Sequence, residues 1–415
     1  MTALDSTDRF AAFRHKSYLY FFISRFLAAF ATQIVSVSVG WQMYDETGSA
    51  LYLGLIGLVQ FLPLLLLMLV TGSVADRYNR RMIMAVCLVL EAICAGLILA
   101  ITLLGLFSPL PIFLLLLAFG VARAFFGPAS QSLAPNLVPQ TDLANAVAWN
   151  SSSWQTAAIV GPVAGGLLYG VGAGLAYGIA LALFCGAGLL VMLIDKPHQR
   201  SAAKATSWAT VLAGFHFIKG EKIVLGAISL DLFAVLLGGA VALMPVYARD
   251  ILALGPWGLG LLRAAPGVGA ILVAIVLATY PIRHHAGIIL FVGVALFGVG
   301  TVLFGLSESP WLSVLALLLV GGADMLSVYV RETLIMLWTP DEVRGRVNAV
   351  NMVFLGASNE LGEFRAGTMA AMIGAVPAVV IGGVGAIAVS ALWAWNFPKL
   401  RQIDSLEAPV IEQDR

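Results

Sequence analysis

Charged side chains inside long apolar segments are the part of this sequence that could do chemistry. A charged group near the centre of a membrane helix costs several kcal/mol, so each one needs an oppositely charged partner or a water-filled cavity. Such groups can form ion pairs, carry protons or hold a gate shut. The candidates are Arg25, Glu91, Arg123, Asp231, Arg263, Asp324, Glu360, Glu363 and Arg365.

Two internal repeats pair four of these charges. An ungapped alignment of the chain with itself at an offset of 201 residues sets Arg123 opposite Asp324. A second alignment, at an offset of 206, sets Arg25 opposite Asp231. Repeats of half the chain length predict two copies of one helical unit around a pseudo-twofold axis. We expect the two pairs to close the cytoplasmic side, separately or as one network, until protons neutralise the aspartates. The alternative is static pairing within each half.

A third group of charges lies late in the chain. Glu360 and Glu363 are three residues apart and therefore share one face of a helix. Two carboxylates repel each other in a low dielectric, and this repulsion raises the pKa of one of them. That carboxylate can then carry a proton at neutral pH, which suits coupling to a proton gradient. The alternative is a buried polar cluster that only holds its helix in place.

Composition limits the class of protein. Of the 415 residues 60% are hydrophobic and 11% are charged, more apolar surface than a soluble domain could bury. The net charge of +1 argues against binding to nucleic acid. The cysteines and histidines lack metal-ligand spacing, and neither a phosphate-binding loop nor a nucleophile–base pair is visible. We expect no metal, no cofactor and no enzymatic activity, so an ion gradient must supply the energy.

Twelve apolar runs are long enough to cross a bilayer, which requires about 20 residues each. Of the 23 Lys and Arg residues, 18 fall on one face of this plan, and these include Arg331 at the end of the span 311–332. Four more lie within spans and only Arg249 falls on the other face, so both termini are predicted to be cytoplasmic. The runs are 17–43, 50–71, 82–104, 110–131, 144–170, 174–194, 222–247, 257–279, 286–306, 311–332, 347–371 and 376–396.

The longest polar interruption divides the spans into two sets of six. The predicted organisation is an N-terminal six-helix bundle (1–194), a cytoplasmic linker with an amphipathic surface helix (195–221), a C-terminal six-helix bundle (222–396) and a cytoplasmic tail (397–415). The linker helix is expected to act as a tether between the bundles.

A charged loop stands between the second and third spans. Gly72 allows a close helix approach, Asp76 can cap the next helix or pair with a cation, and Arg77, Arg80 and Arg81 hold the loop in the cytoplasm. The pattern closely resembles the loop 2–3 signature of the major facilitator superfamily. In that family the loop latches the two halves together on the cytoplasmic side, and the resemblance implies the same role here.

The fifth span carries Gly161, Pro162, Gly165 and Gly166. The proline can kink the helix, and the glycines let a neighbouring helix approach closely. This run also resembles the helix 5 signature of the superfamily's drug/proton antiporters, where it marks exporters. Arg123 fits the helix 4 signature of the same antiporters, which implies a part in proton coupling.

The resemblance narrows further to the enterobactin-exporter-like and macrolide-efflux-like branch. Residues 75–78, 212–215 and 340–351 carry it, whereas residues 358–367 depart from the drug exporters. It implies an all-α integral membrane protein of the bacterial inner membrane, with twelve transmembrane helices in two pseudo-twofold-related bundles. The implied activity is proton-coupled antiport that exports an amphipathic organic solute, siderophore or drug-like, by alternating access, with the protein a monomer in the lipid bilayer.

The remaining predictions concern the solute path and rival functions. Side chains expected to face a central cavity are Gln33, Gln60, Trp154 and Tyr329. An importer or uniporter on the same fold is one alternative, against which the fifth-span signature argues. A lipid or lysolipid flippase is the other, and it would require apolar cavity walls and a lateral opening.

Overall fold

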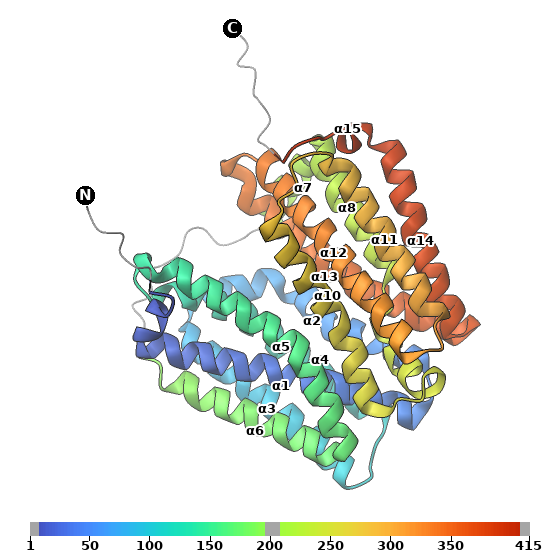
Figure 1. Ribbon diagram of the computed structural model, residues 1–415. Coiled ribbons are helices and arrows are strands. Elements are labelled where there is room, and N and C mark those ends of the chain that lie inside the picture. The colour runs from blue at the N-terminus through green and yellow to red at the C-terminus, as the bar shows by residue number, and fades with distance from the viewer. Residues whose placement is uncertain (1–7, 196–207, 407–415) are drawn as a thin grey trace. The chain divides into compact units, whose positions relative to one another are not determined.

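The structure is a computed structural model that describes residues 8–195 and 208–406, and every regular element in these ranges is helical (Figure 1). The first range contains α1 (Lys16–Thr47), α2 (Ala50–Arg77), α3 (Arg80–Leu103), α4 (Pro109–Leu133), α5 (Leu143–Val171) and α6 (Ala173–Met192). The second contains α7 (Trp208–Gly220), α8 (Lys222–Gly238), α9 (Met244–Val246), α10 (Gly255–Thr279), α11 (Ala286–Leu306), α12 (Pro310–Trp338), α13 (Asp341–Ile373), α14 (Ala375–Asn396) and α15 (Pro398–Arg401).

Ten helices within the described ranges are long and apolar enough to cross a membrane. This confirms an all-helical, multi-span membrane protein. The helices α5 and α13, which cover the predicted spans 144–170 and 347–371, are not among the ten because they carry many amide, hydroxyl or charged side chains. The plan of twelve spans in two bundles therefore stays a prediction.

Contacts divide the chain into two compact units. Unit 1 consists of Met1–Val39 and Leu62–Thr206, and unit 2 consists of Gly40–Phe61 and Ser207–Arg415. The end of α1 and the start of α2, which we call the 40–61 hairpin, thus belong to unit 2 by their contacts, although they lie early in the chain.

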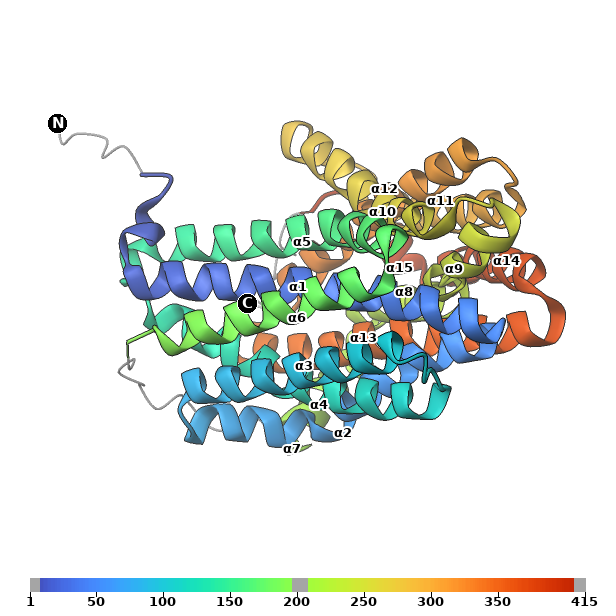
Figure 2. The same ribbon diagram turned by 90° about the horizontal axis from the view of Figure 1, so that it is seen from below.

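In unit 1, glycines of α5 bring this helix against α1. A Cβ atom at Gly161 would lie 2.6 Å from Cβ of Gln33, and one at Gly165 would lie 3.0 Å from Cα of Ile34. The close approach predicted for these glycines is therefore present, and α5 continues through Pro162 without a break. On the other side of the unit, α3 packs against both α4 and α6 (Figures 1 and 2).

In unit 2, the repeat equivalent of Gly161 has the same role. A Cβ atom at Gly362 of α13 would lie 3.3 Å from Cα of Leu236 on α8. The crossing of α10 and α12 is tighter still, because a Cβ at Gly321 would lie 1.8 Å from the carbonyl oxygen of Pro266. Behind them, α11 packs against α12 and α14. Small residues thus set the helix spacing in both units, as expected where lipid provides no hydrophobic drive for association.

A helix, α7, is present within the predicted linker. It packs on α13, where a Cβ at Gly214 would lie 2.6 Å from the carbonyl oxygen of Arg346 and where the buried Ile218 joins an apolar cluster. Residues 196–207 of the linker and residues 407–415 of the predicted tail lie outside the described residues.

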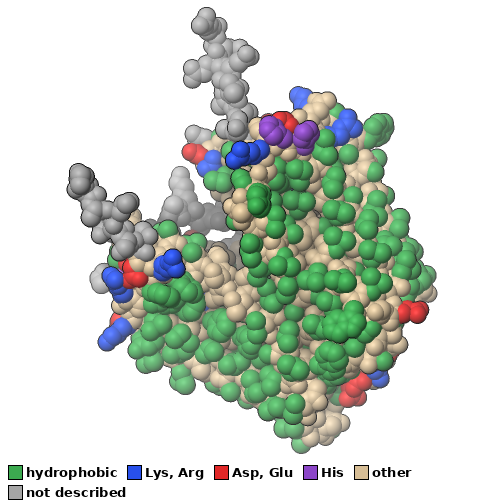
Figure 3. Space-filling model, viewed as in Figure 1, with side chains coloured by type: hydrophobic (Ala, Val, Ile, Leu, Met, Phe, Trp, Pro, Cys, Tyr) green, Lys and Arg blue, Asp and Glu red, His purple; other side chains and the backbone are tan. Residues whose placement is uncertain are grey.

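Apolar side chains dominate the visible surface of both units, and charged side chains gather toward the helix ends (Figure 3). The exposed residues of α3 illustrate this, because Val86, Val89, Ile93 and Leu97 are each about half exposed and recur at helical spacing. In a multi-span membrane protein such a face contacts lipid.

Candidate functional site

Unit 2 buries a cluster of charges where α8, α12 and α13 meet, called here the Asp231 cluster. Arg331 forms an ion pair with Asp231, and their side chains are only 2% and 9% exposed. The guanidinium also lies 3.4 Å from the carboxylate of Glu332, which accepts a hydrogen bond of 3.1 Å from Asn351 Nδ2. Asp324, on α12 with Arg331, interacts electrostatically with both Asp231 and Arg331.

Sequence reasoning missed Arg331, which it assigned to the cytoplasmic end of the span 311–332. The helix α12 instead continues to Trp338, and it buries Arg331. The partner of Asp231 in this structure thus belongs to the same half of the chain. The sequence did contain a signal that Arg331 lies near the acids, because Asp324 and Arg331 are seven residues apart and therefore lie on one face of a helix.

A second group of charges, the Glu363 cluster, contains Arg263, Glu360 and Glu363, which are all half-buried. Arg263 of α10 interacts electrostatically with both carboxylates of α13. The backbone of α2 covers them at Gly57, where a Cβ would lie 2.5 Å from Oε2 of Glu360 and 3.0 Å from Oε2 of Glu363. The two glutamates share a face, and Arg263, whose role the sequence left open, is their cationic neighbour.

Both clusters can pair charges and exchange protons. Arginine stays protonated in proteins, so the carboxylates are their exchangeable acids. Within residues 8–195 and 208–406, no group of three or more His, Cys, Asp or Glu side chains is placed to hold a metal ion.

The 40–61 hairpin is fastened to unit 2 by a polar contact at its tip. Tyr44 Oη donates a hydrogen bond of 2.5 Å to Asp250, and Arg249 Nη2 lies 3.1 Å from Asp45 Oδ1. Arg249 also donates to the Tyr44 carbonyl at 3.2 Å, and its guanidinium lies 5.6 Å from the centre of the Tyr44 ring. Arg249, the one basic residue predicted on the non-cytoplasmic face, thus links the tip of the hairpin to the rest of unit 2.

Arg365 stabilises the end of a broken helix. Its Nε donates to the carbonyl of Leu236 at 2.9 Å and its Nη2 to that of Leu237 at 2.5 Å. These carbonyls belong to the last turn of α8, which ends at Gly238 inside the predicted span 222–247, and they lack partners within the helix. Arg365 therefore has a structural role.

In unit 1 the membrane-depth charges also have neighbours of their own half. Arg123 of α4 interacts electrostatically with Glu91 of α3, which is only 2% exposed, whereas Arg123 itself is exposed. Arg25 of α1 is half-buried and interacts with Tyr18, whose hydroxyl donates to the Ala146 carbonyl at 2.8 Å. Arg123 of unit 1 is thus more accessible than Asp231 of unit 2.

The loop between α2 and α3 is held within unit 1. Asn79 caps α3 by accepting from the Arg81 backbone N–H at 3.0 Å. The buried Arg80 donates to the Ser132 carbonyl at 2.9 Å and lies 3.9 Å from Asp76. Arg81 also donates to the Ile194 carbonyl and Arg77 is exposed, whereas a Cβ at Gly72 would meet no described atom within 4 Å. The close helix approach expected at Gly72 is therefore not seen.

The four predicted cavity residues are divided between the two units, with Gln33 and Trp154 in unit 1 and Gln60 and Tyr329 in unit 2. Trp154 of α5 is 49% exposed, whereas Gln33 of α1 and Gln60 of α2 are half-buried. Tyr329 packs against an apolar core cluster of unit 2. Trp154 is thus the most accessible of them.

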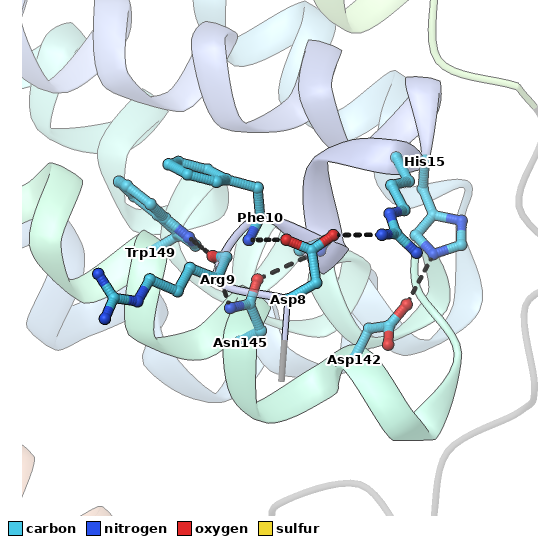
Figure 4. Close-up of polar contacts among 9 residues, drawn as sticks. Asp8, Arg9, Phe10, His15, Asp142, Asn145 and Trp149 are labelled. Atoms are coloured by element: carbon cyan, nitrogen blue, oxygen red, sulfur yellow. Dashed lines mark hydrogen bonds and ion pairs between the residues drawn. The ribbon is translucent and has the colours of Figure 1, made fainter. Parts of the chain in front are cut away.

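The segment before α1 clasps the start of α5 (Figure 4). His15 Nε2 lies 2.9 Å from Asp142 Oδ2, and this hydrogen bond lowers the pKa of the Asp142 carboxyl below its ordinary value of 3.8. Asn145 and Trp149 both donate to the Arg9 carbonyl at 2.9 Å. The clasp fixes the position of α5 at its first turns.

Comparisons with known proteins agree with this architecture. A family model described as "Transmembrane secretion effector" matches residues 7–413. The chain is 24% identical over 408 residues to proteins named enterobactin exporter EntS from Shigella boydii and Escherichia coli, covering 96% of each chain. Among solved structures, it is similar to a bacterial homologue of the human lysosomal transporter Spinster in an inward-facing, unoccupied conformation (TM-score 0.74, 14% identity, 96% and 99% covered). It is also similar to the nucleoside transporter NupG (TM-score 0.68, 16%, 93% and 99%). At these identities the structures show the fold alone, which is that of major-facilitator-type transporters.

Proposed function

The chain belongs to the family of transmembrane secretion effectors, which are transporters of the major facilitator type, and we propose that it exports an amphipathic organic solute in exchange for protons. The curated relatives named enterobactin exporters support outward transport of a siderophore or drug-like solute. The run Gly161–Gly166 supports the same direction, because it resembles the helix 5 signature of exporters.

The observation that carries proton coupling is the excess of acids over arginines in unit 2. The Glu363 cluster has two carboxylates for one guanidinium, and the Asp231 cluster places the buried Asp231 and the half-buried Asp324 beside Arg331. A carboxylate that is buried without its own cation is costly unless it binds a proton. One acid in each cluster is therefore a proton carrier in the proposed cycle.

Alternating access would use an exchange of ion-pair partners. In the state described by the structure Asp231 pairs with Arg331, and in the proposed alternative state Arg25 takes the place of Arg331. Arg123 and Asp324 form the second proposed pair between the halves. The loop residues Gly72, Asp76, Arg77, Arg80 and Arg81 latch the halves in the same state.

The proposed setting is the bacterial inner membrane, where the protein acts as a monomer with both termini in the cytoplasm. Burial of Arg331 removes one residue from the cytoplasmic count, and seventeen Lys and Arg residues against one still favour this orientation.

Transport in proteoliposomes tests the proposal. The full chain is reconstituted with a pH dye inside, a pH gradient is imposed, and movement of enterobactin, the probe, is followed together with proton flux. We expect coupled and opposite movements of probe and protons, and we expect Glu363→Gln and Asp324→Asn to exchange the probe without moving protons. Probe transport by the parent chain with no proton movement contradicts the coupling.

The same vesicles separate the rival functions. Movement of the probe and protons in the same direction indicates an importer. Translocation of a fluorescent lysolipid without movement of enterobactin indicates a flippase. Either outcome overturns the proposed export.

A further inference from the structure

The helix α5 has an exposed face that differs from the lipid-facing side of α3. Its first half exposes Ser151, Ser152, Gln155 and Thr156, which we call the α5 polar stripe. These positions are i, i+1, i+4 and i+5 and therefore lie on one side of the helix. Beyond them the exposed residues become apolar, beginning with Val160.

Two of the four side chains of the α5 polar stripe form hydrogen bonds to the backbone of α5, and the other two do not. Ser152 Oγ donates to the Ala148 carbonyl at 2.9 Å, and Thr156 Oγ1 donates to the Ser152 carbonyl at 2.8 Å. Among the described residues, Ser151 and Gln155 have no hydrogen-bond partner. An unsatisfied amide or hydroxyl in hydrocarbon is costly, so the stripe faces water or a polar molecule rather than lipid.

A positive charge is exposed on another helix of unit 1. Arg123, Gly127 and Gln131 of α4 are spaced by four residues and lie on one face. Arg123 and Gln131 are exposed, and a Cβ at Gly127 would meet no described atom within 4 Å. The acid beside Arg123, Glu91, is buried, so the charge presented on this face is positive.

The stripe also has a rigid support. The clasp of His15 on Asp142 and of the Arg9 carbonyl on Trp149 fixes α5 within the nine residues before Ser151 (Figure 4). Trp154, which is 49% exposed, adds an aromatic surface beside the stripe. A recognition surface needs side chains that are held in position by their surroundings.

We infer that the α5 polar stripe and the exposed face of α4 contact the transported solute, and that they select an organic solute with several hydrogen-bonding groups and a negative charge. The hydroxyl and amide groups of the stripe pair with the polar groups of the solute, Trp154 packs on its apolar part, and Arg123 attracts its charge. This inference rests on the proposed transport function, but it does not depend on proton coupling.

Cysteine labelling tests whether the stripe faces water. The background variant is Cys185→Ser, because Cys87 and Cys94 are buried and Cys185 is exposed. Gln155→Cys is compared with Val89→Cys, a matched position on the apolar face of α3. We expect a membrane-impermeant methanethiosulfonate to label position 155 at least about tenfold faster, because the reactive thiolate does not form in hydrocarbon. Equal rates overturn the inference.

The charge preference is read from two reagents of opposite charge. At Gln131→Cys, two turns from Arg123, we expect the anionic sulfonatoethyl reagent to react faster, relative to its rate with a free thiol, than the cationic trimethylammonioethyl reagent. Adding Arg123→Gln should lower that rate ratio by about threefold or more, as expected for removal of a nearby unit charge. An unchanged ratio contradicts the role of Arg123.

Solute contact is tested with enterobactin as the probe. We expect it to protect Gln155→Cys from labelling, and we expect the pair Ser151→Ala and Gln155→Leu to raise KM about tenfold with little change in maximal rate, since two hydrogen bonds are lost. The control Val160→Leu on the apolar part of α5 should leave KM unchanged. Proton-coupled transport with normal KM in the double variant overturns the inference and leaves the proposed function standing. Protection by enterobactin and a raised KM without proton flux would support the inference and contradict the proton coupling of the proposed function.

Discussion

The guanidinium of Arg331 on α12 forms an ion pair with the carboxylate of Asp231 on α8, and both side chains are almost fully buried in unit 2. The pair ties together two helices that the sequence separates by about a hundred residues. Removing one member of a buried pair leaves the other charge without compensation, which is far more costly than removing both.

Arg331→Gln and Asp231→Asn should therefore each destabilise the protein by about 3–5 kcal/mol, and the double variant should recover most of that loss. Thermal unfolding in detergent, followed by size-exclusion chromatography, measures the effect. The control is Asp341→Asn, which breaks an exposed pair with Arg344 and should change stability little. Additive losses in the double variant would show that the two charges do not stabilise each other.

Two glycines of the 40–61 hairpin should respond differently to the same substitution. At Gly57 a Cβ meets the tips of the Glu360 and Glu363 carboxylates, which can move. At Gly54 it meets the α13 backbone, 3.1 Å from Cα of Gly367. We expect Gly57→Ala to fold normally and to reduce proton-coupled transport about tenfold or more, because it displaces the proposed proton carriers.

Gly54→Ala should instead lower stability by about 1–3 kcal/mol, as overpacking against a backbone does. Purification yield and unfolding temperature, compared with transport rate, separate the two effects. If Gly57→Ala transports like the parent chain, the Glu363 cluster is not needed for coupling.

The α1–α5 contact predicts a position effect within one helix. Gly161→Ala places a methyl group 2.6 Å from Cβ of Gln33, so the helices must move apart at a cost of about 1–3 kcal/mol. Gly170→Ala, on the same helix but in open space, should be neutral or slightly stabilising, because alanine favours helix. Equal unfolding temperatures for the two variants would contradict the close packing.

The clasp between His15 and Asp142 should make the start of α5 acid-sensitive. The hydrogen bond lowers the pKa of Asp142 below 3.8, so its stabilising contribution is complete above that value and is lost as the pH falls through the lowered pKa. Hydrogen exchange of residues 143–149, corrected for the intrinsic pH dependence of amide exchange, should rise on acidification in the parent chain. Asp142→Asn should show high exchange at every pH, whereas a parent-like pH response in that variant would assign the effect to another group.

Much of the architecture follows from the sequence. Long apolar runs predict membrane helices because bilayer thickness demands them, and the repeat predicts that Gly161 and Gly362 do the same work in their two halves. The match over residues 7–413 confirms the superfamily inferred from the loop at Asp76 and from the fifth-span glycines. The glutamates of the Glu363 cluster were recognisable because three residues along a helix place two carboxylates on one face.

Tertiary structure decided which charges become partners. Sequence periodicity reports the face of a helix that a residue occupies, but the identity of the neighbouring helix depends on packing between distant segments. For this reason Arg331 and Arg263 became partners of the acids, Arg365 became the cap of α8, and the 40–61 hairpin joined unit 2. The sequence alone was enough to predict a membrane transporter with charged residues in its helices. Only the tertiary structure decided which carboxylates share an arginine and which helix face stays polar and exposed.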